Sequence, residues 1–108
     1  MSKIAIVVLS GQDNPGRATA GLHVAKRIYD ARQENGIDAV EVFLFTEGLK
    51  ILGNPDGDLG HLVHELVEAG IVVGGCTNQL NNWNLADAAT KAGVQSEFAR
   101  DTFSRYAR

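Results

Sequence analysis

The sequence predicts a single α/β domain, a three-layer arrangement in which helices cover both faces of a mostly parallel sheet. Short apolar runs rich in β-branched residues alternate along the 108-residue chain with segments whose apolar side chains recur at helical spacing. Glycine, proline and asparagine separate these segments. Strands that alternate with helices favour a parallel sheet with crossover helices, and a chain of this length supplies one hydrophobic core.

Composition narrows the class of protein. The net charge is −3 and the pI is about 5.5, so we expect no nucleic-acid partner, which would need a basic patch. No run approaches the roughly 20 apolar residues of a membrane-spanning helix, and the apolar start lacks the basic segment of a signal peptide. A single cysteine excludes an internal disulfide and a multi-cysteine zinc site. We therefore expect a cytoplasmic protein without membrane partners.

The first half of the chain predicts two strands and a helix. IAIVVL at 4–9 is a continuous apolar run, typical of a strand buried on both faces. After it, Asn14 is placed to cap a helix and Pro15 suits the first helical position. Apolar spacing extends this helix to Asn35, where Gly36 ends it, and AVEVFLF at 39–45 predicts the second strand, followed by a short helical turn.

The second half predicts a third strand and three helices. Asp58 is placed to cap a strongly amphipathic helix, and IVV at 71–73 reads as a strand. Asn84 is placed to cap a short helix, and Ser96 to open the last one. A sheet of three strands has an exposed edge, and exposed edges are normally paired or covered, so we expect an oligomer.

Cys76 is the first candidate site residue. In a parallel sheet, functional groups gather beyond the carboxyl ends of the strands, which here are followed by 10–16, 46–48 and 75–78. A helical turn after Cys76 would bring backbone N–H groups of Thr77 and Asn78 close to the thiol and stabilise a thiolate. A thiolate attacks sulfane sulfur and holds it as a persulfide, or forms mixed disulfides. Cysteine also packs as a small buried apolar group, and spacing alone slightly favours that alternative.

The loop after the first strand is the second candidate. Gly11 to Ala18 has the glycine spacing of a phosphate-binding loop, but Arg17 and Ala18 replace the lysine and the hydroxyl residue. Nucleotide hydrolysis is therefore not expected. The loop is either a well-capped turn or a site for a simple anion at a helix N-terminus. On either interpretation Gly11, Asn14 and Gly16 are candidate rim residues, and the loop would form the wall opposite Cys76.

Other polar residues carry weaker signals. Glu47, at the end of the second strand, could carry a proton near Cys76, but a carboxylate there would disfavour the thiolate. We therefore place Glu47 on the rim only, together with Gly75, whose missing side chain allows close approach. His61 and His64 could share a metal by their spacing, but no third ligand is evident, so a solvated face is expected.

These segments together resemble the DsrE/DsrF-like family of small sulfur-relay proteins. The resemblance covers nearly the whole chain and rests on IAIVVLSG, VEVFLFTEGLKIL and LVHELVEAGIVVGGCTNQL. The segment EAGIVVGGC carries most weight, because in the family a helix ending in glycine leads into a short apolar strand and then a cysteine. Cys76 matches the cysteine that accepts a persulfide and passes it on in the sulfur-transferring members.

The resemblance implies a function and an assembly. It implies one DsrE-like domain over residues 1–108, a trimer or hexamer, no organic cofactor, and sulfur donor and acceptor proteins as partners. The family continues after a stretch like GVQSEFARDTFSRYAR into a final strand, so this chain is expected to lack that strand. The alternative is a non-catalytic oligomeric binding module, in which the rim holds a small anion or a protein partner and Cys76 only packs.

Overall fold

The computed structural model describes residues 2–108 and contains one parallel sheet of four strands. The strands lie in chain order, β1-β2-β3-β4. Their bounds are Ser2–Val8 for β1, Ile37–Leu44 for β2, Val72–Cys76 for β3 and Gln95–Glu97 for β4. The predicted α/β class with a parallel sheet is confirmed. Within the described residues, no helix is both long and apolar enough to cross a membrane.

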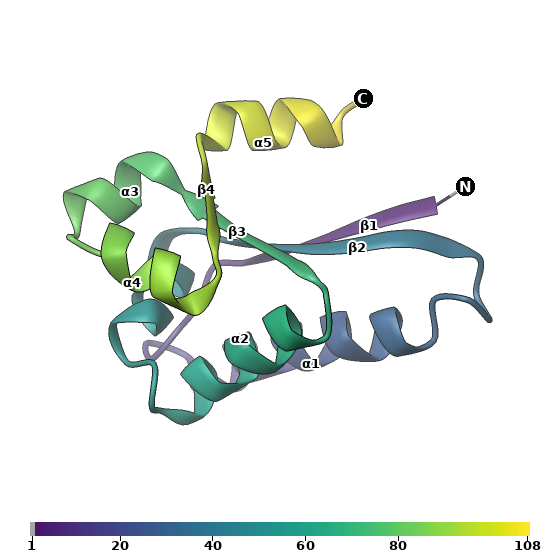
Figure 1. Cartoon of the computed structure of the whole chain (residues 1–108), viewed down its shortest axis with the longest axis horizontal. Helices are drawn as coiled ribbons and strands as arrows, with labels where there is room; N and C mark the ends of the chain where they lie inside the picture. The colour runs from purple at the N-terminus through teal and green to yellow at the C-terminus, as the bar shows by residue number, and fades with distance from the viewer. Residues whose placement is uncertain (1) are drawn as a thin grey trace.

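The helices are distributed unequally over the two faces of the sheet. They are α1 (Pro15–Asp30), the 3₁₀ helix η1 (Thr46–Gly53), α2 (Asp58–Glu68), α3 (Thr77–Asn82), α4 (Ala86–Ala92) and α5 (Ala99–Tyr106). When strands follow chain order and their crossovers share one hand, the connecting helices lie on one face. Figure 1 shows α1, α2 and α4 below the sheet, α5 above it and α3 beyond the end of β3. Helices therefore cover both faces, as predicted, but the upper layer is a single short helix.

The core lies mainly between the sheet and the lower helices. Successive side chains of a strand point to opposite faces, so Val42 and Leu44 of β2 face α1 and α2. Phe43 points to the other face, where the ring of Phe103 on α5 meets it edge-on with centroids 5.6 Å apart. β2 is consequently buried on both faces over its second half.

β1 differs from the prediction that it is buried on both faces. It is an edge strand, and Lys3 and Ala5 are exposed on the face that carries α5. They pair with Ala39 and Glu41 of β2, and no described helix covers this part of the sheet. The apolar run IAIVVL therefore buries one side against the lower helices and leaves the other open.

The predicted helix starts and ends are partly confirmed. Asn14 caps α1, since its Oδ1 accepts a hydrogen bond from Arg17 N at 3.2 Å, and Pro15 takes the first helical position. The helix ends at Asp30, earlier than predicted, and a turn leads to Gly36, whose φ is +68°. Asp58 is the first residue of α2 and follows the N-cap position, which Gly57 occupies.

The C-terminal part contains the main difference from the sequence prediction. Residues 95–97 form β4, which pairs in parallel with β3, where the last helix was predicted to begin. The helix α5 begins only at Ala99. α4 begins at Ala86, and Asn84 does not cap it but adopts a left-handed backbone with φ +55°. No further strand follows α5 in the described chain.

Candidate functional site

The carboxyl ends of β1, β2 and β3 lie on one rim of the sheet. Thr46, just after β2, connects the segments that follow all three strands. The Thr46 backbone N–H donates to Gln79 Oε1 at 2.8 Å, and the Thr46 hydroxyl shares its one proton between the carbonyl oxygens of Phe45, at 2.7 Å, and Leu9, at 3.1 Å. Thr46 has φ +54°, a strained conformation for a β-branched residue. Strain of this kind persists only where surrounding contacts enforce it. Here the bond to Gln79 ties η1 to α3, and the bond to Leu9 ties η1 to the loop that follows β1.

The Gly11–Gly16 loop is closed largely on itself. Gly11 N–H donates to Asp13 Oδ1 at 2.8 Å, and Arg17 N–H donates to Asn14 Oδ1 at 3.2 Å. Because side chains of the loop already use these N–H groups, they are not free for a bound anion. Gly11 is buried, and a Cβ there would lie 2.5 Å from the Glu47 carbonyl oxygen, so its role is close packing against η1. Gly16 is exposed.

Cys76 is the last residue of β3 and immediately precedes α3. Its exposed fraction is 4%, so the thiol is covered. Gly75 makes the packing beneath it possible, because a Cβ at Gly75 would lie 2.7 Å from Leu49 Cδ2 and within contact of Leu80 and Val94. The strand end is therefore pressed against η1 and α3 with no space for a side chain.

A hollow of about 310 Å³ adjoins Cys76. Its lining residues are Cys76, Asn78, Phe98, Ala99 and Arg100. No carboxylate is among them, and the one permanent charge is the guanidinium of Arg100. The wall opposite Cys76 is therefore the start of α5 and the residue before it. The prediction that the Gly11–Gly16 loop forms this wall is wrong, because α5 lies on the face of the sheet that the crossover helices leave free.

The predicted rim residues thus fall into two groups. Asn78 shares the hollow with Cys76, and Thr77 lies between them in sequence as the first residue of α3. Glu47 belongs to the other group with the β1 loop: its Oε1 pairs with Lys50 Nζ at 3.1 Å, and it does not line the hollow. His61 and His64 are exposed on α2, away from the rim, where they line a groove shared with α4.

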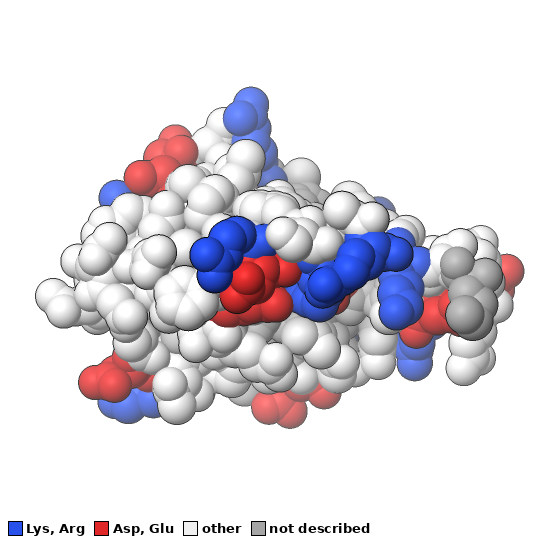
Figure 2. Space-filling model, turned by 90° about the horizontal axis from the view of Figure 1, so that it is seen from above, with Lys and Arg blue, Asp and Glu red and all other residues white. Residues whose placement is uncertain are grey.

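Charged side chains gather on the face that carries α5. Figure 2 shows Lys and Arg beside Asp and Glu along the middle of this face, with mainly uncharged surface to their left. The centre of this group is Arg105. Its Nη1 and Nη2 each donate at 2.9 Å to Glu41, and Nη2 also donates at 2.8 Å to Glu97 Oε1.

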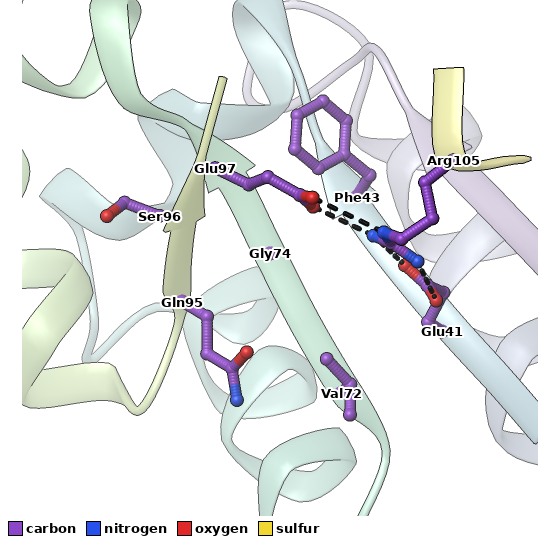
Figure 3. A pocket seen from close by; sticks show the side chains of 8 residues that line it. All are labelled: Glu41, Phe43, Val72, Gly74, Gln95, Ser96, Glu97 and Arg105. Carbon is purple, nitrogen blue, oxygen red and sulfur yellow. Dashed lines mark hydrogen bonds and ion pairs between the residues drawn. The ribbon is translucent and has the colours of Figure 1, made fainter. Parts of the chain in front are cut away.

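This ion-pair cluster joins three elements. Figure 3 shows Glu41 from β2 and Glu97 from β4 directed toward Arg105 from α5, beside a pocket of about 420 Å³. Tyr106 adds a hydrogen bond from its hydroxyl to Glu41 Oε1 at 3.0 Å. The cluster therefore fastens α5 to the sheet, and with it the Phe98–Arg100 wall of the Cys76 hollow.

The electrostatics of the cluster favour its charged state. Hydrogen bonds from Arg105 hold the pKa of the Glu41 and Glu97 carboxyls below their usual value of 4.5, although burial opposes this. Burial, and then the charge of Glu41, raise the pKa of Tyr106. The sequence contained one sign of the cluster: Glu41 interrupts the apolar run AVEVFLF, and a half-buried carboxylate needs a partner. Its partner, 64 positions away, could not be inferred from spacing.

Comparison with known proteins identifies the fold. No protein-family model and no curated protein sequence matches the chain. The solved structure of BT1422 from Bacteroides thetaiotaomicron, a conserved protein of unknown function, matches with TM-score 0.77 and 16% identity over 98% of this chain and 87% of that chain. The ychN protein from E. coli matches with TM-score 0.71 and 18% identity over 96% of this chain and 91% of that chain. At these identities the likeness shows a shared fold.

Proposed function

We propose that this protein is a sulfur-relay protein that accepts sulfane sulfur on Cys76 and passes it on as a persulfide. The observation that carries the proposal is the hollow beside Cys76, whose lining residues include the chain's single cysteine and one cation, Arg100, but no carboxylate. The resemblance to the DsrE/DsrF-like family supports the same role for Cys76. Thr77 and Asn78, whose backbone N–H groups were expected to reach the thiol, are the first two residues of α3, but the Cys76 side chain makes no capping hydrogen bond there.

The proposed reaction is two thiol exchanges in sequence. The Cys76 thiolate attacks the outer sulfur of a donor persulfide, the donor S–S bond breaks, and the donor leaves as a thiolate. The outer sulfur is then held on Cys76 in a new S–S bond. An acceptor thiolate attacks that sulfur and releases Cys76 as a thiolate. Neither step needs an oxidant or a cofactor, because each exchanges one S–S bond for another.

The hollow also defines the path by which a sulfur donor would reach the Cys76 thiol. Cys76 is covered from most directions, so a donor approaches only along the space that Phe98, Ala99 and Arg100 border. A volume of about 310 Å³ accommodates an added sulfur atom without displacing the core. The resemblance implies that donor and acceptor are proteins and that the chain forms a trimer or hexamer. A cytoplasmic location is our expectation from the sequence.

Intact mass spectrometry after incubation with a persulfide donor tests this function. The wild-type protein is expected to gain one sulfur atom and Cys76→Ser none, since Cys76 is the only cysteine. If neither protein gains sulfur, the proposal fails and the alternative holds. In that alternative the protein is a non-catalytic oligomeric binding module, and the 4% exposure of Cys76 reflects packing alone.

A further inference from the structure

Arg100 differs from Arg105 because only one nitrogen of its guanidinium has a partner in residues 2–108. Its side chain is 84% exposed, and its one partner in residues 2–108 is Asp101, whose Oδ1 lies 3.4 Å from Arg100 Nε. The terminal nitrogens of the guanidinium have no partner in that part of the chain. Arginine offers these nitrogens as a planar fork that fits carboxylates and other oxyanions.

The carboxylate that lies opposite Cys76 in the sheet register is already ion-paired. Glu97 pairs with Cys76 in the β3–β4 register, but both Glu97 oxygens hydrogen-bond to Arg105. Arg105 thus offsets Glu97, and Arg100 is the one cation among the residues that line the hollow. The remaining walls, Phe98, Ala99 and the Asn78 amide, are uncharged.

The size of the hollow limits what can enter it. Its volume of about 310 Å³ is at the lower end of small-molecule cavities, which span roughly 300–1,000 Å³. A compact group with one negative charge fits both the space and the guanidinium, whereas a helix or folded segment does not fit.

We propose that Arg100 is a specificity residue that selects sulfur donors bearing a negatively charged group beside the sulfane sulfur. This inference rests on the proposed role of Cys76. A small oxyanion such as thiosulfate and an acidic group next to the persulfide of a carrier protein share this chemistry. With thiosulfate, the Cys76 thiolate takes the outer sulfur, the S–S bond breaks, and sulfite leaves with the electron pair while Arg100 stabilises its charge.

Alkylation with iodoacetate and iodoacetamide tests the selection without any sulfur chemistry. The two reagents are close in size, but iodoacetate is negatively charged and iodoacetamide is neutral. The ratio of their reaction rates at Cys76 therefore reports the electrostatic potential at the thiol, because any difference in accessibility affects both rates equally. We expect Arg100→Gln to lower the iodoacetate-to-iodoacetamide ratio by about threefold to fivefold at low salt, and Arg100→Lys to change it little. Asp101→Asn should raise the ratio, because it removes the opposing charge. Arg27→Gln, on α1 under the opposite face, is the matched control and should leave it unchanged.

The possible results separate the two proposals. A ratio that is the same in wild type and Arg100→Gln overturns the role of Arg100, whatever Cys76 does with sulfur. Failure of both reagents to modify Cys76 also overturns it, because the hollow then admits no ligand. Failure of every persulfide donor to load Cys76, despite a normal charge-dependent ratio, overturns the relay function instead. If thiosulfate loads sulfur onto Cys76 in the wild type but not in Arg100→Gln, the donor is a small molecule. If the alkylation ratio depends on Arg100 but thiosulfate does not load Cys76, the anionic group belongs to a larger carrier.

Discussion

Cys76 owes its position to the residue that precedes it. Gly75 is buried, and the space where its side chain would stand is filled by Leu49, Leu80 and Val94. The end of β3 therefore lies deeper than a strand with side chains at every position would allow. As a result, the Cys76 thiol is enclosed on the core side and borders free space only toward α5.

Gly75→Ala tests this packing. The new Cβ would meet Leu49 Cδ2 at 2.7 Å, so we expect a loss of about 1–3 kcal/mol in the free energy of unfolding, as for other overpacked core sites. Urea denaturation measures the loss. Gly16→Ala is the matched control, because its nearest neighbour would be Asn14 Oδ1 at 3.9 Å, and it should be nearly neutral. Equal effects at both positions would show that Gly75 is not needed for close approach.

At the scale of elements, α5 depends on side chains that arrive from distant parts of the sequence. It has eight residues, too few to be a stable helix alone, and its charged face is held by Glu41 and Glu97. Phe103 contributes by packing on Phe43 and Phe45. α5 is also one wall of the Cys76 hollow, so whatever loosens the helix should expose the thiol.

Arg105→Gln tests the coupling between α5 and Cys76. The substitution removes the bonds to both carboxylates, and we expect Cys76 to react several-fold faster with a neutral alkylating reagent because α5 departs from the sheet more often. Arg108→Gln, at the same end of the chain, is the control and should leave the rate unchanged. An unchanged rate in Arg105→Gln would mean that α5 does not limit access to Cys76.

The ion-pair cluster of Arg105, Glu41 and Glu97 also predicts that the free energy of unfolding depends on pH in the acid range. The pKa values of Glu41 and Glu97 are lowered in the folded protein, so the unfolded chain binds protons first as pH falls. Their contribution is complete well above pH 4.5 and is lost as pH falls below that value. We therefore expect the difference in unfolding free energy between wild type and Glu41→Gln to shrink over this range. A difference that stays constant from pH 7 to pH 3 would contradict the ion-pair account.

The elements also show what the sequence could and could not reveal. Long periodic segments, such as 59–67 in α2, were predictable because one apolar stripe fixes both their type and their buried face. β4 was missed because QSE is short and polar, and only its pairing with Gly74–Cys76 makes it a strand. The wall opposite Cys76 was misplaced for the same reason: it depends on contacts between β4, α5 and Glu41 that leave no local pattern.

At the scale of the whole molecule, the strand order determines which surfaces are free. Crossovers that progress in one direction place α1, α2 and α4 on one face and leave α5 to cover part of the other. The uncovered part includes Ala5 of β1, and Val72 of β3 is 47% exposed nearby. β1 and β4 remain as sheet edges, which proteins normally pair or protect.

This arrangement predicts self-association. We expect sedimentation equilibrium to give a mass of three or six times the 11.6 kDa chain, with the open face or a sheet edge buried between subunits. Val72→Lys should weaken the assembly, since it places a charge on the open face, while the exposed Val24→Lys on α1 serves as control. A protein that remains a monomer at high concentration would refute the expectation.

Transfer of labelled sulfur through Cys76 tests the central claim most directly. Protein loaded from a donor carrying a heavy sulfur isotope is freed of donor and mixed with an acceptor thiol, and both masses are followed. The relay account predicts that the label appears on the acceptor as Cys76 returns to its unmodified mass, faster than transfer from free cysteine persulfide at the same concentration, and that Cys76→Ser carries no label. Label that never reaches Cys76, or that stays there while the acceptor remains unlabelled, would contradict the account.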